Sequence, residues 1–154
     1  MFSSASSTEA DVLLSFKGSI QDPKNTLSSW SNNSAVHYCN WTGITCTTSP
    51  PLACSSLESL NLSNNHIWGP IPDQISQFHS LRVFDFSKNH IEGRIPESFG
   101  LLVKLQVLNL GSNLLSGSVP SVFVNLTELA VLDLSQNVYL MSDVPSEIGK
   151  AWEA

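Results

Sequence analysis

The sequence predicts an α/β solenoid, in which stacked coils place short parallel strands on one side and a helical cap covers the N-terminal end. Two observations predict this fold class. Residues 57–149 repeat every 24 residues, and the apolar spacing inside each repeat fits neither a helix nor a full strand. Residues 8–56 lack the repeat and begin with the apolar spacing of an amphipathic helix.

The repeat is visible in four columns that share one register. Within a column, successive residues are 24 positions apart. The columns are Leu57, Leu81, Leu105 and Leu129; Leu60, Phe84, Leu108 and Leu132; Leu62, Phe86, Leu110 and Leu134; and Asn65, Asn89, Asn113 and Asn137. Such a unit cannot bury its apolar side alone, so neighbouring units stack and share one core.

Each repeat is expected to supply one short strand, with its leucines pointing inward and the residues between them pointing outward. The asparagine column indicates a structural ladder. An inward amide can donate to and accept from loop backbone that has no sheet partner. Replacing such an asparagine with leucine should cost roughly 1–3 kcal/mol, because those backbone groups would stay unsatisfied.

A second motif follows the asparagine in three repeats, at 69–72, 93–96 and 117–120, and reads G-x-I-P or G-x-V-P. Together with L-x-x-L-x-L-x-x-N-x-L, it resembles the plant-specific subclass of leucine-rich repeats. The resemblance implies a right-handed superhelical coil with a parallel β-sheet on the concave face. Glycine suits a turn with positive φ, and proline suits the convex side. The expected convex wall is Ile75, Phe78, Phe99, Leu102, Phe123 and Leu126.

The fourth repeat, at the end of residues 57–149, is irregular. Asn113 precedes Pro120 by seven residues, whereas Asn137 precedes Pro145 by eight, and Met141 occupies the glycine column. Residues 150–154 are assigned to a tail. We expect the last coil to fray or to continue in a longer parent protein.

The cap, residues 8–56, should begin with a helix. Thr8 and Asp11 have the spacing of a capping box. Gly18 and the Asp22–Pro23 pair should weaken or end the helix. Its expected apolar face is Val12, Leu13, Phe16 and Ile20.

The cap also holds the cysteines. The segment C-N-W-T-G-I-T-C, preceded by L-S-S-W, resembles the N-terminal cap of plant receptor-kinase ectodomains, and the resemblance implies a disulfide between Cys39 and Cys46. Cys54 lies three residues before Leu57 and so falls in a convex core column. It is interpreted as a small buried residue with a free thiol, and an intermolecular disulfide is the alternative.

The predicted location is extracellular: secreted, or on the outer side of the plasma membrane if the chain is part of a longer receptor. A disulfide would indicate an oxidising compartment. No signal peptide is visible, and no apolar run approaches the ~20 residues needed to cross a bilayer. Four N-x-S/T sequons agree with the extracellular location, at Asn32, Asn40, Asn61 and Asn125.

The outward positions of the predicted strands form the candidate binding face, in which polar columns flank an apolar strip. Such a face suits a peptide or a protein loop, although each residue could also be a solvated sheet residue. The candidates are Glu58, Arg82, Val83, Asp85, Lys88, Gln106, Val107, Asn109, Val131 and Asp133.

Two further features lie outside that face. Trp68 is either an exposed contact anchor or packed against the cap. His66 and His90 share a column and should lie about 5 Å apart on adjacent coils. Their protonation near pH 6 could loosen this edge, and plain exposed packing is the alternative. No third ligand at a suggestive spacing supports a metal site, and no cofactor is predicted.

The sequence excludes several function classes. A net charge of −6 argues against nucleic acid and anionic membranes as partners. No nucleophile elbow or kinase signature is present, so the chain is not expected to be an enzyme. The resemblance implies a recognition module that binds a peptide, a steroid or a co-receptor ectodomain, in a truncated or soluble form that we expect to be monomeric. The alternatives are an inhibitor of cell-wall hydrolases, similar to polygalacturonase-inhibiting proteins, and a truncated splice product without activity.

Overall fold

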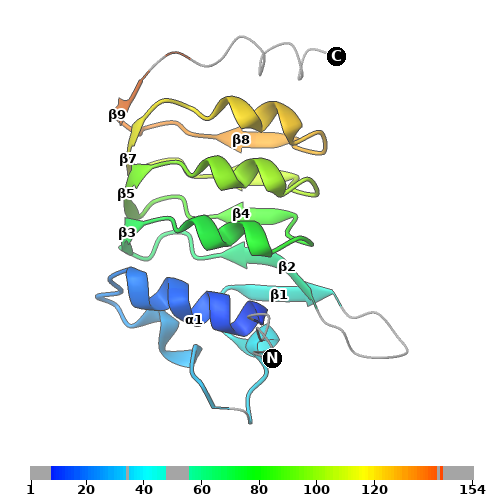
Figure 1. Cartoon of the computed structure of the whole chain (residues 1–154). Coiled ribbons are helices and arrows are strands. Elements are labelled where there is room, and N and C mark those ends of the chain that lie inside the picture. The colour runs from blue at the N-terminus through cyan, green and yellow to red at the C-terminus, as the bar shows by residue number, and fades with distance from the viewer. Residues whose placement is uncertain (1–7, 34, 48–55, 142, 144–154) are drawn as a thin grey trace, which may run out of the picture.

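The computed structural model describes residues 8–33, 35–47, 56–141 and 143. It shows a cap at one end and stacked coils above it (Figure 1), which confirms the predicted α/β solenoid with parallel strands. Cys54, residues 51–53, most of the last repeat beyond Met141, and the tail 150–154 lie outside the described residues, so the predictions made for them stay predictions.

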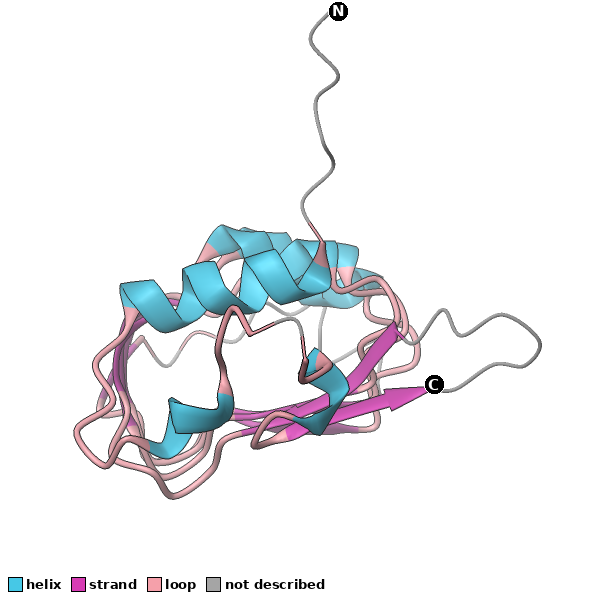
Figure 2. Ribbon diagram, turned by 90° about the horizontal axis from the view of Figure 1, so that it is seen from below, coloured by secondary structure: helices cyan, strands magenta, loops and turns pink. Residues whose placement is uncertain are grey.

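Each coil contributes to three layers. Seen along the stack (Figure 2), short helices lie on one side, one sheet lies opposite, and a second sheet joins them at one end. The helices of the repeats are the 3₁₀ segments η3 (Asp73–Gln77), η4 (Glu97–Leu101) and η5 (Ser121–Asn125). A proline precedes each as its N-cap, because a fixed φ in the extended region starts the turn without needing an N–H.

The first sheet, called the main sheet, has the order β1-β2-β4-β6-β8. It contains β1 (Ile44–Thr47), β2 (Ser56–Asn61), β4 (Val83–Asp85), β6 (Val107–Asn109) and β8 (Val131–Asp133). From β2 to β8 the strands are parallel, and the leucine column is in register: Leu60 pairs with Phe84, and Leu108 pairs with Leu132. β1 runs antiparallel to β2 and covers the first edge of this sheet.

The second sheet, called the lateral sheet, has the order β3-β5-β7-β9 and did not follow from the sequence patterns. It contains β3 (Trp68–Pro70), β5 (His90–Arg94), β7 (Leu114–Gly117) and β9 (Tyr139–Leu140). These strands are also parallel, but they pair with an offset shorter than the repeat: Trp68 lies beside His90, and Glu92 lies beside Leu114.

The core lies between the three layers. The leucine and phenylalanine columns of the first three repeats and the predicted convex wall are buried. Three phenylalanines link the layers: Phe84 stacks on Phe86 with ring centroids 4.4 Å apart and meets Phe99 of η4 edge-on at 5.3 Å. Aromatic residues in these columns therefore bridge the main sheet and the helical side.

The cap begins with α1 (Glu9–Ser19), whose N-cap Thr8 forms the predicted capping box with Asp11. The predicted apolar face is buried. Lys17 in the last turn donates from Nζ to the carbonyls of Leu27 and Trp30, at 2.8 Å each, and so ties α1 to the next segment. Two further 3₁₀ segments follow, η1 (Thr26–Ser29) and η2 (Tyr38–Asn40).

The predicted disulfide is confirmed. Cys39, in η2, is bonded to Cys46, in β1, and their Cα atoms are 5.6 Å apart. Beside it, Trp30 and Trp41 stack with ring centroids 5.7 Å apart, and both are buried. The bridge and the tryptophan pair hold β1 against the end of the solenoid.

Candidate binding surfaces

The asparagine ladder sets the geometry of both sheets. Asn89 accepts at Oδ1 from the N–H groups of Asn65 and Ile67, at 3.0 and 2.9 Å. Its Nδ2 donates to the carbonyls of Leu62 and Phe86, at 2.8 and 3.0 Å. Asn113 and Asn137 donate to carbonyls in the same way one and two coils further on, and each accepts from one N–H group, that of Ile91 and that of Leu115. Each amide therefore satisfies buried backbone in the segment that leads from the main sheet to the lateral sheet.

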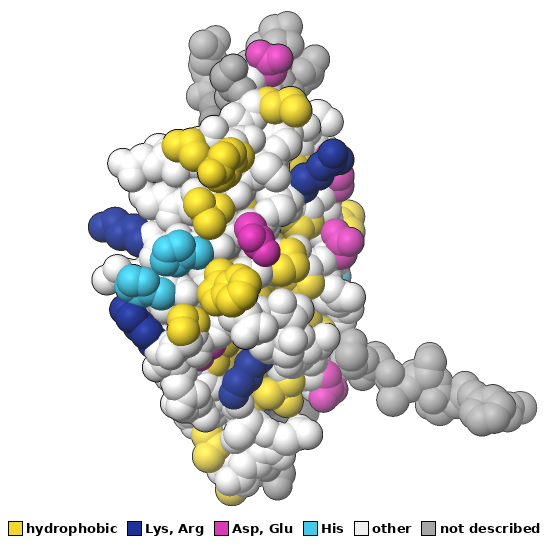
Figure 3. All heavy atoms as spheres, turned by 90° about the vertical axis from the view of Figure 1, so that its left-hand side faces the viewer, with side chains coloured by type: hydrophobic (Ala, Val, Ile, Leu, Met, Phe, Trp, Pro, Cys, Tyr) yellow, Lys and Arg dark blue, Asp and Glu magenta, His cyan; other side chains and the backbone are white. Residues whose placement is uncertain are grey.

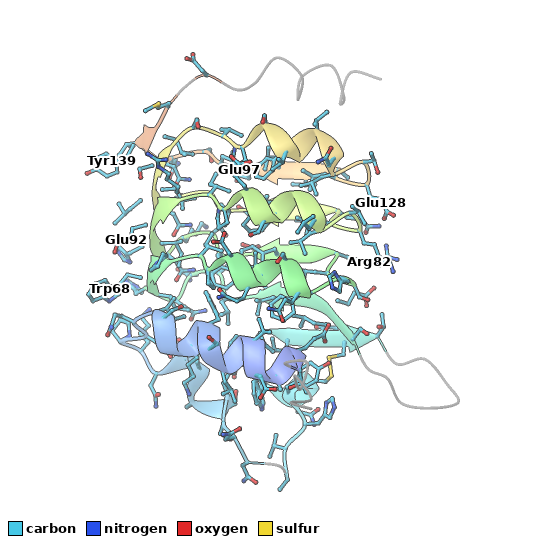
Figure 4. All side chains as sticks on the ribbon, viewed as in Figure 1. Trp68, Arg82, Glu92, Glu97, Glu128 and Tyr139 are labelled. Carbon is cyan, nitrogen blue, oxygen red and sulfur yellow. A yellow bond between two sulfur atoms is a disulfide. The ribbon has the colours of Figure 1, made fainter. Side chains whose placement is uncertain are left out.

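Arg82, at the start of the candidate face, is already engaged. Its Nε lies 3.3 Å from Oε1 of Glu58, and its Nη1 lies 3.6 Å from Oε2 of Glu128. These three side chains are partly exposed, so the ion pairs contribute little to stability. Figure 4 shows Arg82 and Glu128 together at the edge opposite the lateral sheet. An anionic ligand would have to displace both carboxylates.

A structural role for the column of Asn61, Asp85, Asn109 and Asp133 was missed by the sequence analysis. Each side chain accepts at Oδ1 from the backbone N–H two residues later, at distances from 2.9 to 3.1 Å. This Asx turn directs the chain out of the main sheet. The signal was present in the sequence, because the column contains only Asn and Asp.

The column of Lys88 also has a backbone role. Its members adopt left-handed backbone with φ between 55° and 61°: Asn64, Lys88, Ser112 and Gln136. The Lys88 N–H donates to the carbonyl of Gly111 in the next coil, at 2.9 Å. Lys88 itself is exposed, so its side chain, unlike its backbone, is available to a partner.

The apolar strip of the candidate face is continuous. Val83 pairs with Val107, and Val107 pairs with Val131. The first two are half-buried, whereas Val131 is 48% exposed. The structure therefore brings the valines together with Glu58, Arg82 and Gln106, although these polar side chains have intramolecular partners.

A second surface lies on the lateral sheet (Figure 3). There an open groove of about 420 Å³ is lined by Pro23, His66, Trp68, His90, Glu92 and Leu114. The rings of His66 and His90 are 5.5 Å apart between centroids, in agreement with the predicted distance. We call the outward side of β3, β5, β7 and β9, together with this groove, the lateral surface.

Both sequence-based alternatives for Trp68 hold in part. Its backbone joins the cap, because its N–H and C=O bond to the C=O and N–H of Gln21 at 3.1 and 2.8 Å. Its side chain is 48% exposed. The residue therefore contacts the cap through its backbone and presents its indole ring to solvent.

The four sequon asparagines are all exposed: Asn32, Asn40, Asn61 and Asn125. Ser34, which completes the first sequon, lies outside the described residues. Asn61 points outward from β2, as expected from its place between Leu60 and Leu62.

Among the described residues, no three His, Cys, Asp or Glu side chains are grouped so that they could hold a metal ion. Within the same part of the chain, no helix has the length and apolar character to cross a bilayer.

Comparison with known proteins follows the same division into cap and repeats. Residues 6–47 match the leucine rich repeat N-terminal domain, and residues 55–115 and 80–139 match the leucine rich repeat model. A probably inactive leucine-rich repeat receptor-like protein kinase of Arabidopsis thaliana is 49% identical over 86 residues, which are 54% of this chain and 9% of that protein. The chain thus spans only a small part of that relative.

Solved structures are similar to this chain in fold. The crystal structure of PEPR1–AtPEP1 superposes with a TM-score of 0.83 at 30% identity, over 93% of this chain and 20% of that one. The BIR3–SERK2 complex from Arabidopsis thaliana gives a TM-score of 0.62 at 30% identity, over 90% of this chain and 86% of that one.

Proposed function

Because the chain belongs to the leucine-rich repeat family, with the N-terminal domain and repeats of plant receptor-kinase ectodomains, we propose that it is a non-catalytic recognition module. Its partner would be a peptide, a protein ligand or the ectodomain of a partner receptor in plant signalling. It would act outside the cell, where Asn32, Asn40, Asn61 and Asn125 would be glycan acceptors. Binding would change which receptor chains associate.

The valine strip of the main sheet is the observation that carries this proposal. Val83, Val107 and Val131 form an apolar line held in register by strand pairing. Polar positions flank the line, with Gln106 and Lys88 among them. Because the asparagine ladder and the Asx turns already hold this backbone, little conformational entropy would be lost when a ligand binds.

The similar proteins support the choice of partner class. PEPR1 was solved with AtPEP1, and BIR3 was solved with SERK2. For this chain the corresponding ligand would cover Val83, Val107 and Val131. Asp85, Asn109 and Asp133 would then act mainly by shaping the strand ends, and Arg82 would bind only after leaving Glu58 or Glu128.

The test is capture of partners from a plant apoplast or membrane extract on the immobilised oxidised protein. Val131→Lys places a charge on the strip at an exposed position, and Val124→Lys is the matched control on η5, where the valine is 40% exposed. We expect the partner to be lost by Val131→Lys and retained by Val124→Lys. Equal retention by both variants would exclude the main sheet as the site.

The identity of the captured protein separates the remaining alternatives. A receptor ectodomain or a secreted peptide agrees with the proposal. Capture of a pectinase would instead favour an inhibitor of cell-wall hydrolases. A truncated product without activity would capture neither.

A further inference from the structure

The lateral surface presents a different set of side chains in each coil. Along β5, His90, Glu92 and Arg94 point outward while Ile91 is buried. Across the sheet, Glu92 lies between Pro70 of β3 and Leu114 of β7 in register. The carboxylate of Glu92 is therefore flanked by apolar residues on both neighbouring strands.

Large apolar side chains lie on the same side of the stack as that carboxylate, on β3, β7 and β9 and just after β9. They are exposed by 39% to 63%: Trp68, Leu114, Tyr139 and Met141. Figure 4 shows Trp68, Glu92 and Tyr139 one above the other on the same side of the stack. A row of exposed apolar groups with polar groups among them is the composition of a protein-binding surface rather than of scattered surface residues.

Glu92 forms no ion pair with any residue that the structure describes. Two basic residues of its own strand face the same way, His90 and Arg94. The Arg94 stem packs over β7, where a Cβ on Gly117 would lie 3.1 Å from Arg94 Cγ, and the His90 ring lies beside that of His66, 5.5 Å away between centroids. A partner that covers the apolar groups would also remove water from Glu92. Burying an unpaired carboxylate is costly, so a partner that supplies a cation there is favoured over one that does not.

We propose that the lateral surface docks a segment of a partner protein in which an arginine is flanked by apolar side chains. The guanidinium pairs with Glu92 and stacks on the Trp68 indole, while the apolar neighbours cover Leu114 and Tyr139. With strands about 4.8 Å apart and residues about 3.3 Å apart along each strand, one guanidinium can reach both groups. Arginine fits better than lysine because its planar fork both stacks on an aromatic ring and pairs with a carboxylate.

This surface lies on a different sheet from the valine strip, so the inference goes beyond the proposed function. One chain could hold a ligand on the main sheet and a second protein on the lateral sheet. A second copy of this chain is a weaker candidate for the occupant, because each copy carries a net charge of −6 and copies therefore repel each other.

The test uses random 12-residue peptides displayed on phage and selected on the oxidised full chain. Synthetic copies of the enriched peptides are then titrated against variants. We expect enriched sequences with an arginine between apolar residues, and at least tenfold weaker binding to Trp68→Ala and to Glu92→Gln. Glu92→Lys should select acidic peptides instead, which is an effect that a merely structural role would not produce.

Matched controls lie on η4. Leu101→Ala removes an apolar side chain that is 64% exposed, and Glu97→Gln removes an exposed carboxylate. Both should bind the peptides normally. Val131→Lys should also bind them, whether or not it loses its main-sheet partner. Trp68→Ala should stay folded, because the contacts of Trp68 with Gln21 are made by backbone atoms.

Three outcomes would overturn the proposal. One is the absence of peptides that prefer the wild type to Trp68→Ala. Another is that the enriched peptides lack a basic residue or bind Glu92→Gln as tightly as the wild type. The third is sedimentation showing a wild-type dimer that Trp68→Ala abolishes, which would make a second copy the occupant.

Discussion

The main sheet and the lateral sheet are built from the same coils, yet they use their outward residues differently. On the main sheet, strands pair with the 24-residue offset of the repeat, as Phe84 with Leu108. Two columns recur in every coil: one holds only Asn or Asp, and the other keeps a left-handed backbone. On the lateral sheet, strands pair at offsets of 22 or 23, as Trp68 with His90 and Ser116 with Tyr139.

The difference identifies positions that the turns require. The Asx column and the left-handed column recur because every coil needs the same turn. Trp68, Glu92 and Tyr139 do not recur, so the turn does not require them. Positions that differ between coils therefore have no competing role in the turn, whereas the recurring valine strip has to be tested by Val131→Lys.

The largest effect should come from breaking the ladder that joins the two sheets. Asn89→Leu would leave the N–H groups of Asn65 and Ile67 without their acceptor. The carbonyls of Leu62 and Phe86 would lose one donor each but keep the amides of Asn65 and Asn113. We expect the free energy of unfolding to fall by about 2–3 kcal/mol in urea denaturation.

Asn65→Leu is the matched control for that change. Asn65 is only half-buried, and its Oδ1 accepts from the Thr26 hydroxyl at 3.3 Å rather than from backbone of a neighbouring coil. The loss should be clearly smaller than at Asn89. Equal losses at the two positions would contradict the bridging role of the ladder.

The sequence predicted the main sheet better than the lateral sheet for a physical reason. In each of the first three repeats, one polar residue separates two inward apolar residues, as Asp85 separates Phe84 from Phe86, and this alternation marks a half-buried strand. The lateral strands are short and hold residues that disfavour strands, such as Gly69 and Pro70 in β3. They form because stacked coils bring these segments side by side, and no local pattern encodes that arrangement.

The same limit applied to the candidate surfaces. The valine strip followed from the column pattern, whereas the groove around Trp68 needed the strand offset to be known. The partners of Arg82 were also hidden: Glu58 lies in the preceding repeat of its own column, but Glu128 lies in the loop before β8. Side-chain reach between coils, rather than periodicity, decides such contacts.

A smaller effect on stability should come from exchanging residues with left-handed backbone, Gly93 in the lateral sheet and Lys88 after the main-sheet strand β4. Gly93, in the lateral strand β5, has φ of 81°, and a Cβ there would meet only Pro70 Cβ, at 3.9 Å. Since space is available, Gly93→Ala should cost only the left-handed backbone, about 1 kcal/mol by thermal or urea unfolding. A loss of several kcal/mol would mean that the lateral strands cannot adjust.

Lys88→Gly is the reverse exchange on the main-sheet side. Lys88 has φ of 55°, so glycine removes the left-handed penalty, while the greater freedom of glycine in the unfolded chain opposes the gain. We expect stabilisation of no more than about 0.5 kcal/mol. Destabilisation would show that the lysine side chain itself supports the turn.

The smallest effect concerns the charge on an Asx turn of the main sheet. The hydroxyl and then the N–H of Ser135 lower the pKa of Asp133 below its usual value. A lowered folded-state pKa gives stability that is present above the unfolded-state pKa, about 3.9, and is lost as the pH falls through the folded-state value. Because Asp133 is largely solvent-screened, the contribution is small.

Asp133→Asn keeps an Oδ1 acceptor without the charge, so its deficit in urea midpoint at pH 7 should shrink toward pH 3. Asp73→Asn, at an exposed position on η3, is the control, and a deficit at Asp133 that does not change with pH would mean that the turn needs only the acceptor oxygen.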